Sequence, residues 1–398
     1  MLFALTWLGC ASETDVSSGS RSSGSSGQPS PQGQATGGTG GKGNVAIGAG
    51  GSQGAGAGVQ GGTGGGVAGM SFAQGGAGGV GMGIAGSGIG GQPGGGSGSG
   101  GTTGPVTYPM LDAAAIGVPT QVMLTTPVTL AEGPLWDPCG HQLLFVDVNA
   151  SKIFALSSTG QQTEFMTNTS NANGIAFDPT DGSLILAQMG GAPGHVARRT
   201  KSGMVQRIDP PGSLLHTPDD VVVRSDGTIY FTDGDFYPIG TALGYNAQLP
   251  VYQIPPGTMV LKNGGTVSGP NGIELSPDEK TLYVDGFGEG TVWTFSVAVD
   301  GSVTKGKPLA TGLTNPDSLC VDAAGNLYVG VKAGLQVLRP DGSMVKLIPI
   351  TSSQGVTNCT FGDDGKTLYI TAWTTMWKIL GMPIPGLDFV NNTARLKC

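Results

Sequence analysis

Six stretches of the chain share one pattern of polar and apolar positions. Each begins with an acid or an amide, continues as a short apolar run, passes through a turn, and ends in a second apolar run. In one copy, Asn173-Gly-Ile-Ala-Phe is followed by Asp181-Gly182 and then by Leu184-Ile-Leu-Ala. Short apolar runs joined by such turns are typical of antiparallel β-strands. The six copies begin at Glu132, Asn173, Asp219, Asn271, Asp317 and Asn358.

The spacing of the copies predicts the fold. Their first residues lie 41 to 52 positions apart, which is the length of a four-stranded propeller blade. The run Gln121-Val-Met-Leu precedes the first copy, and we expect it to supply the outer strand of the last blade and so close the ring. No stretch has a convincing helical period. The sequence therefore predicts an all-β, six-bladed β-propeller over residues 105–398.

The third copy carries a long insertion. Residues 234–256 interrupt it and contain Phe236, Tyr237, Tyr245 and Tyr252. Loops of this length in a compact domain are commonly functional. We expect the insertion to cap the channel mouth as a wall of a substrate site, with Tyr237 as a substrate-binding candidate. The alternative is an ordinary hairpin loop whose tyrosines pack on the blade edge.

The leading residues of the copies predict a polar ring. The innermost strand of each blade lines the channel of a propeller, so residues in the same register encircle the axis. The carboxylates of Glu132, Asp219 and Asp317 would repel one another there unless a cation neutralised them or their pKa values rose. Oxygen ligands suit Ca²⁺, or another divalent cation of that kind, and the lack of His and Cys disfavours zinc and copper. The alternative is a water-filled polar channel without a metal.

The N-terminal quarter of the chain has a different composition. Residues 12–104 are nearly all Gly, Ser, Ala, Thr and Gln, so we expect a disordered, flexible tether over residues 11–104. Residues 1–10 form a short apolar run that resembles the lipobox of a bacterial lipoprotein, with Cys10 as the lipidated residue. The run lacks Lys and Arg, and Trp7 stands where Leu is usual. The alternatives are a cleaved signal or an accidental apolar start.

Charge and cysteine content limit the partners. The net charge of −8 disfavours nucleic acid and anionic membranes as partners, so any membrane contact would come through the lipid anchor. The spacing of the cysteines fits no zinc site. We expect Cys320 and Cys359 to be small core residues, and we leave open a disulfide between Cys139 and Cys398, which an exported protein could form. We expect a monomer in the extracytoplasmic bacterial cell envelope, or secreted.

Several of these motifs resemble the senescence-marker-protein/gluconolactonase family of calcium-dependent propeller hydrolases. The resemblance covers residues 130–381, and its motifs are specific when taken together. They are Glu132-Gly-Pro-Leu-Trp136, Asn173-Gly-Ile-Ala-Phe-Asp178, the segment from Pro218 to Asp233, Pro270-Asn271-Gly and Asn315-Pro-Asp317.

The resemblance implies a role for individual residues. Glu132, Asn271 and Asp317 would bind the metal, and Asp317 would also act as the general base. Asp219 stands where the family has an Asn that contacts metal or substrate, which makes Asp219 a candidate for both substrate binding and catalysis. Its extra charge should tighten metal binding and weaken the pull of the metal on a carbonyl. We take Asn173 as a further substrate-binding candidate.

The chain also departs from the family pattern next to the ring. Blade 2 has Gln188-Met189-Gly190 where the family often has Glu-His-Gly. His216-Thr217 stands before Asp219 where a basic or amide residue is common, and we take His216 as another substrate-binding candidate.

Together these features predict a calcium-dependent hydrolase that opens a small-molecule lactone or related ester. Within the same fold the alternative chemistry is phosphoester hydrolysis. From a different class, the alternative is a non-enzymatic propeller that binds a sugar or peptide, with Ca²⁺ purely structural.

Overall fold

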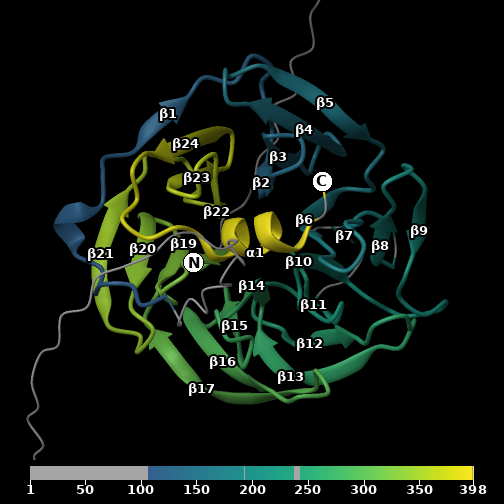
Figure 1. Ribbon diagram of the computed structural model, residues 1–398. Coiled ribbons are helices and arrows are strands. Elements are labelled where there is room, and N and C mark those ends of the chain that lie inside the picture. The colour runs from purple at the N-terminus through teal and green to yellow at the C-terminus, as the bar shows by residue number, and fades with distance from the viewer. Residues whose placement is uncertain (1–105, 192, 237–242, 397) are drawn as a thin grey trace, which may run out of the picture. The chain divides into compact units, whose positions relative to one another are not determined.

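The computed structural model describes residues 106–191, 193–236, 243–396 and 398, and these form a ring of six four-stranded antiparallel sheets around a central axis (Figure 1). The six-bladed propeller predicted from the repeat is therefore confirmed. The proposed tether over residues 11–104, Cys10 and Tyr237 lie outside the described residues.

In blades 1 to 3 the chain runs from the channel outwards. Blade 1 has β2 (Ala131–Asp137), β3 (Gln142–Asp147), β4 (Lys152–Ser157) and β5 (Gln162–Thr167). Blade 2 has β6 (Ala172–Phe177), β7 (Leu184–Gln188), β8 (His195–Arg199) and β9 (Val205–Arg207). Blade 3 has β10 (Thr217–Val223), β11 (Ile229–Gly234), β12 (Gln248–Ile254) and β13 (Lys262–Ser268).

Blades 4 and 5 repeat this order, and blade 6 combines strands from both ends of the domain. Blade 4 has β14 (Pro270–Leu275), β15 (Thr281–Gly286), β16 (Thr291–Val297) and β17 (Val303–Thr311). Blade 5 has β18 (Leu319–Val321), β19 (Leu327–Val331), β20 (Gly334–Leu338) and β21 (Met344–Pro349). Blade 6 has β22 (Asn358–Gly362), β23 (Thr367–Ala372), β24 (Thr375–Ile379) and β1 (Thr120–Val122).

The strand β1 closes the ring. It pairs antiparallel with β24, with Thr120 opposite Lys378 and Val122 opposite Met376. Blade 6 thus gains its outer strand from the N-terminal side of the domain, as the position of the run at 121–124 predicts. A short 3₁₀ helix, η1 (Ala113–Ala115), precedes β1.

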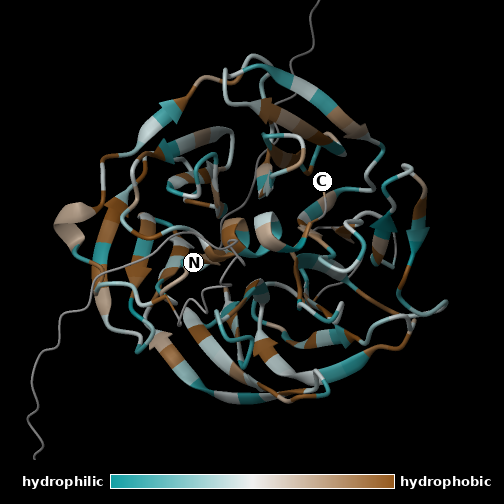
Figure 2. Ribbon diagram, viewed as in Figure 1, coloured by the Kyte–Doolittle hydropathy of each residue, from teal (hydrophilic) through white to brown (hydrophobic). Residues whose placement is uncertain are grey.

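Apolar side chains hold neighbouring blades together. Figure 2 shows hydrophobic residues on the strands of every blade. The fully buried Tyr230 and Phe295, for example, belong to one cluster between blades 3 and 4, and Phe145 and Tyr369 belong to one between blades 6 and 1. The hydrophobic core therefore lies between the faces of neighbouring blades, and the polar residues at the starts of the inner strands line the channel.

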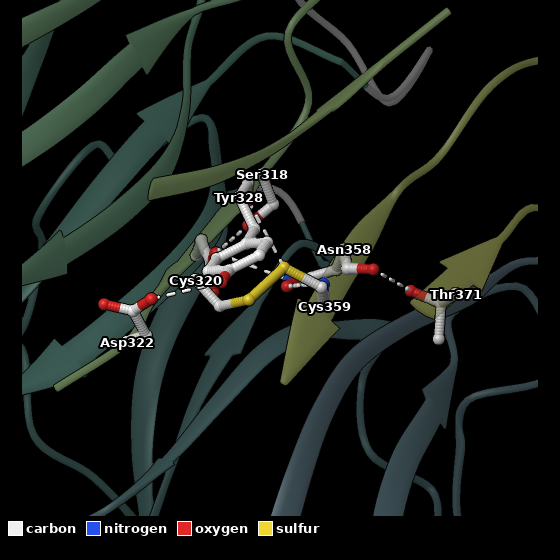
Figure 3. Close-up of a disulfide and its surroundings, with 8 residues drawn as sticks. Ser318, Cys320, Asp322, Tyr328, Asn358, Cys359 and Thr371 are labelled. Atoms are coloured by element: carbon white, nitrogen blue, oxygen red, sulfur yellow. Dashed lines mark hydrogen bonds between the residues drawn. A yellow bond between two sulfur atoms is a disulfide. The ribbon is translucent and has the colours of Figure 1, made fainter. Parts of the chain in front are cut away.

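Three expectations from the sequence need correction. A helix, α1 (Leu387–Arg395), ends the chain although no helical period is evident; its first turn is largely apolar and the rest is polar, so the pattern spans too few residues to stand out. The second half of the segment 234–256 is not loop, because β12 is a regular blade strand. Cys320 and Cys359 are buried, as expected, but they form a disulfide that joins β18 to β22 (Figure 3).

The C-terminal segment lies at the end of the channel away from the leading residues. Figure 1 shows α1 at the centre of the ring. Phe389 packs against the turn at Gly365, and the Arg395 guanidinium lies 2.9 Å from Glu279 in the turn that follows β14. A second disulfide joins Cys398 to Cys139 in blade 1, with 5.2 Å between the Cα atoms, so the pairing left open from the sequence is present. No helix among the described residues is long and apolar enough to span a membrane.

Candidate active site

Five of the six leading residues lie at the starts of the inner strands, as the shared register predicts, and Asp317 lies two residues before β18. Five of them are buried, and Asp317 is half-buried. Asn271 Nδ2 donates to Asp317 Oδ1 at 3.0 Å, and Asn173 Nδ2 donates to Asp219 Oδ1. The structure therefore brings the predicted ligands and the predicted catalytic residues into one ring around the axis.

A register shift follows the leading residue in the inner strand of blade 1 and includes the leading residue in blades 2 to 4. In blade 3 the shift lies between Pro218 and Val221. Such a bulge re-aims side chains that would otherwise alternate between the two faces. In blade 2 the residue after the leading Asn173 must be glycine, because a Cβ on Gly174 would lie 2.3 Å from Asp220 Oδ1. The Asn-Gly pair in the repeat thus records the close approach of adjacent inner strands.

The bulge in blade 3 brings Asp220 into the channel, which the sequence analysis missed. Its carboxylate accepts hydrogen bonds from Ser318 Oγ at 2.5 Å and from Asn358 Nδ2 at 3.4 Å. Strict alternation would have pointed Asp220 away from the ring, so only the doubled acid in the Pro-Asp-Asp motif hinted at it. Asp220 therefore links blades 3, 5 and 6 across the axis. Asn358 takes part in this link, and among the described residues no hydrogen bond joins it to the predicted metal ligands.

Burial and mutual repulsion raise the pKa values of the ring carboxyls. Burial, followed by the charges of Asp317, Asp219 and Asp220, raises the pKa of Glu132 well above its usual range. Burial raises the pKa of Asp317 to about 7, and the hydrogen bond from Asn271 opposes this rise. Burial and the charge of Asp317 likewise raise the pKa of Asp219. Without a counter-charge these carboxyls therefore lose their protons at a higher pH than ordinary acids do, as expected when acids share a low-dielectric channel.

The donor set fits a hard divalent cation. Glu132, Asn271 and Asp317 offer only oxygen ligands, and the repulsion between the two acids would be relieved by a positive charge between them. Within the described parts of the chain, no three His, Cys, Asp or Glu side chains are spaced as a metal site. The predicted ligands Glu132, Asn271 and Asp317 include only two acids, so they would not form a cluster of three such side chains. Asn271 would have to turn its Oδ1 towards the cation, because that oxygen is the only acceptor of its amide.

His216 lies beside the ring as half of an Asp–His pair. Asp233 is fully buried, accepts the His216 backbone N–H at 2.9 Å, and lies 3.3 Å from His216 Nδ1. This hydrogen bond raises the pKa of His216, and burial opposes it. Asp233 lies opposite Pro218, the residue before Asp219, which places the pair beside the ring. The sequence alone selected His216, but it did not reveal its partner.

Comparisons with known proteins show which family the chain resembles. A family described as the SMP-30/Gluconolactonase/LRE-like region matches residues 130–374. A gluconolactonase from Zymomonas mobilis is 29% identical over 309 residues, which covers 68% of this chain and 84% of the relative. The solved structure of a gluconolactonase from Xanthomonas campestris has a TM-score of 0.60 at 27% identity and covers 69% of this chain and 94% of its own.

A third comparison supports the fold. The structure of a regucalcin from Agrobacterium tumefaciens, described in its title as a calcium-binding protein, has a TM-score of 0.55 at 18% identity. It covers 67% of this chain and 94% of its own.

Proposed function

The chain belongs to the SMP-30/gluconolactonase/LRE-like family, and from this premise we propose that it is a calcium-dependent hydrolase of a lactone. The observation that carries the proposal is the ring in which carboxylates of three blades and amides of the others face one channel. Relatives named gluconolactonase support the lactone as substrate class. The name of a calcium-binding protein of the same fold supports the choice of cation.

We propose Glu132, Asn271 and Asp317 as the residues that hold the cation. When bound, a calcium ion would supply Lewis-acid polarisation of the lactone carbonyl. Glu132 and Asp317 would balance its charge, and the raised pKa values of both carboxyls in the metal-free protein are the reason they would favour it.

Asp317 is the proposed general base. As a carboxylate beside the cation, Asp317 can take a proton from a neighbouring water molecule. Its hydrogen-bond partner Asn271 fixes the orientation of the carboxylate. The water that loses its proton to Asp317 attacks the lactone carbonyl carbon. The ring C–O bond then breaks as Asp317 returns the proton to the leaving ring oxygen, which gives the hydroxy acid.

Asp219 and Asn173 form the proposed substrate-binding side of the ring. The amide of Asn173 donates to Asp219 and so holds this carboxylate in place. As a carboxylate, Asp219 can accept hydrogen bonds from substrate hydroxyls but repels an acidic substrate. His216, fixed by Asp233, is a third polar group close to this side of the ring.

We also propose an oxidising, extracytoplasmic location. Support comes from the disulfides Cys139–Cys398 and Cys320–Cys359, because such bonds persist mainly in exported proteins.

Hydrolysis of a lactone panel, followed by pH-stat titration of the released acid, tests the proposal. We expect turnover with calcium, loss of turnover with a chelator, and loss of at least two orders of magnitude in kcat for Asp317→Asn, in line with removal of a general base. Asp181→Asn is the matched control, because Asp181 lies in an exposed turn away from the ring. Calcium binding without turnover of any lactone would replace the hydrolase by a binding propeller. Full activity in Asp317→Asn with none in Asp219→Asn would make Asp219 the base.

A further inference from the structure

A second ring of side chains lies on the mouth side of the leading residues. In blades 1, 2 and 4, the residue that follows the second strand pairs with the residue two positions before the leading one. Val148 N donates to Leu130 O at 3.0 Å, and Phe287 N donates to Gly269 O at 2.8 Å. Directly opposed residues, and residues two apart on one strand, project from the same face of a sheet. In blade 1 this places Val148 on the face of Glu132. In blades 2 and 4 the positive φ of Asn171 and Gly269 breaks the alternation, and Met189 and Phe287 are placed by their contacts with Asn173 and Phe236.

The second ring, which we call the mouth ring, is largely apolar. Its members in blades 1, 2 and 4 are Val148, Met189 and Phe287. We include two more residues that follow second strands: Lys332 of blade 5 donates its N–H to Thr314 O, and Trp373 O of blade 6 accepts the N–H of Ala131, next to Glu132.

Blade 3 fills its place in the mouth ring in an unusual way. The residue opposite Thr217 is Gly234, and a Cβ there would lie 2.1 Å from Cε2 of Phe236. The Phe236 ring thus occupies the space of the missing side chain. Its backbone N–H donates to Thr217 Oγ1 at 3.2 Å, two residues before Asp219, which fixes the aromatic ring next to the site. Blade 3 therefore contributes an aromatic group as well.

The aromatic groups of blades 3 and 4 pack on one another. The ring centroids of Phe236 and Phe287 lie 5.6 Å apart, and Tyr245 lies 5.6 Å from the first and 5.5 Å from the second. Phe236 also packs against the cluster that contains Met189, whose sulfur accepts a hydrogen bond from Asn173 Nδ2 at 3.5 Å. A continuous apolar wall thus runs from the leading ring to the surface.

The wall is open to a ligand. Phe236, Phe287 and Trp373 are half-buried, so a ligand above the leading ring can cover apolar surface that now faces water. Lys332 is the one charged member of the mouth ring, and its ammonium donates to Ser353 O at 2.8 Å. A polyhydroxylated lactone would lose hydrogen bonds to water along such a wall without regaining them, whereas an apolar substituent loses none.

We propose that the mouth ring selects lactones that carry an apolar ring or alkyl chain over polyhydroxylated sugar lactones. This inference rests on the proposed lactone hydrolysis and names its substrate class. Phe236, Phe287 and Trp373 are the specificity-determining residues.

A chain-length series tests the inference. We expect kcat/KM on γ-lactones with a growing alkyl substituent to rise by up to about fourfold per added methylene, which is the gain from burying one such group. Glucono-lactone should have a lower kcat/KM than the longer members. In Phe287→Ala the rise in kcat/KM per methylene should shrink. Phe389→Ala is the matched control, because Phe389 is a half-buried aromatic of α1 at the opposite end of the channel.

A second variant and a binding assay keep the test decisive. Trp373 has φ of 60°, a backbone conformation that Asn adopts readily, so Trp373→Asn should fold even if Phe287→Ala does not. Calorimetry with the corresponding non-hydrolysable alkyl lactams reports on the wall without catalysis. Chain-length-dependent lactam binding that either variant weakens would support the wall even if no lactone is hydrolysed, in which case only the proposed function fails. A flat series in both assays, or a higher kcat/KM on glucono-lactone than on every alkyl lactone, would overturn the inference.

Discussion

Replacement of Asp317 by Asn should reverse how the protein responds to pH and to calcium. The carboxyl of Asp317 has an ordinary pKa of 3.8 and a pKa of about 7 in the folded, metal-free protein. Ionisation is therefore about 4 kcal/mol less favourable in the folded state than in the unfolded chain. Between these two values the folded state binds more protons, so the free energy of unfolding falls as the pH rises from about 4 to about 7.

The Asn side chain has no proton to lose over this range of pH. Without metal, Asp317→Asn should gain up to about 4 kcal/mol relative to wild type between pH 4 and pH 8. With excess calcium the order should change, because the wild type then gains from cation binding and the variant lacks a ligand. Urea denaturation of the full chain at pH 4, 6 and 8, with calcium or with chelator, measures all of these differences.

Two results would refute this reasoning. If the free energy of unfolding depended on pH in the same way in wild type and in Asp317→Asn without metal, the pKa of Asp317 would not be raised in the folded state. Equal stabilisation of both proteins by calcium would remove Asp317 from the ligand set. The exposed-turn variant Asp181→Asn should follow the wild type throughout.

Three further predictions concern other parts of the molecule. Asp219→Asn removes one charge beside the cation, so calorimetry should show weaker calcium binding while kcat on neutral lactones rises; tighter binding would contradict the charge argument. Cys139→Ser breaks a crosslink to Cys398 that spans 259 residues, and denaturant titration should show a loss of up to about 5 kcal/mol unless the unfolded chain stays compact. Asp233→Asn should lower the pKa of His216 in an NMR titration, and an unchanged pKa would contradict the pairing of His216 with Asp233. Because a raised histidine pKa stabilises the folded state only while the histidine is protonated, the wild type should lose this stabilisation as the pH rises through the pKa of His216.

The repeat made the architecture readable from the sequence. Leading residues at fixed intervals implied blades, and the spare strand before the first copy implied closure of the ring, both of which the sheet order confirms. These features depend on local alternation and on length, which a sequence records directly. The polar ring followed because a shared register places equivalent residues around one axis.

Features that depend on departures from regularity could not be read in this way. Asp220 enters the channel only because of the bulge between Pro218 and Val221, and a bulge leaves no periodic signal. The ring of Phe236 substitutes for the side chain of Gly234 only through a turn of the backbone. The Cys320–Cys359 disulfide required the distance between two inner strands of different blades.

The pairing of β1 with β24 has a consequence for how the protein forms. Thr120 and Lys378 meet although 258 residues separate them, so this contact carries a large loop-closure entropy and no nearby chain can make it early. Blades 1 to 5 consist of contiguous hairpins and can assemble locally as the polypeptide emerges. Blade 6 must wait for the last strands, and until then β1 and the edge of blade 6 stay unpaired. We therefore expect ring closure to be the slow step of folding, and the moment at which the chain is most exposed to edge-to-edge aggregation.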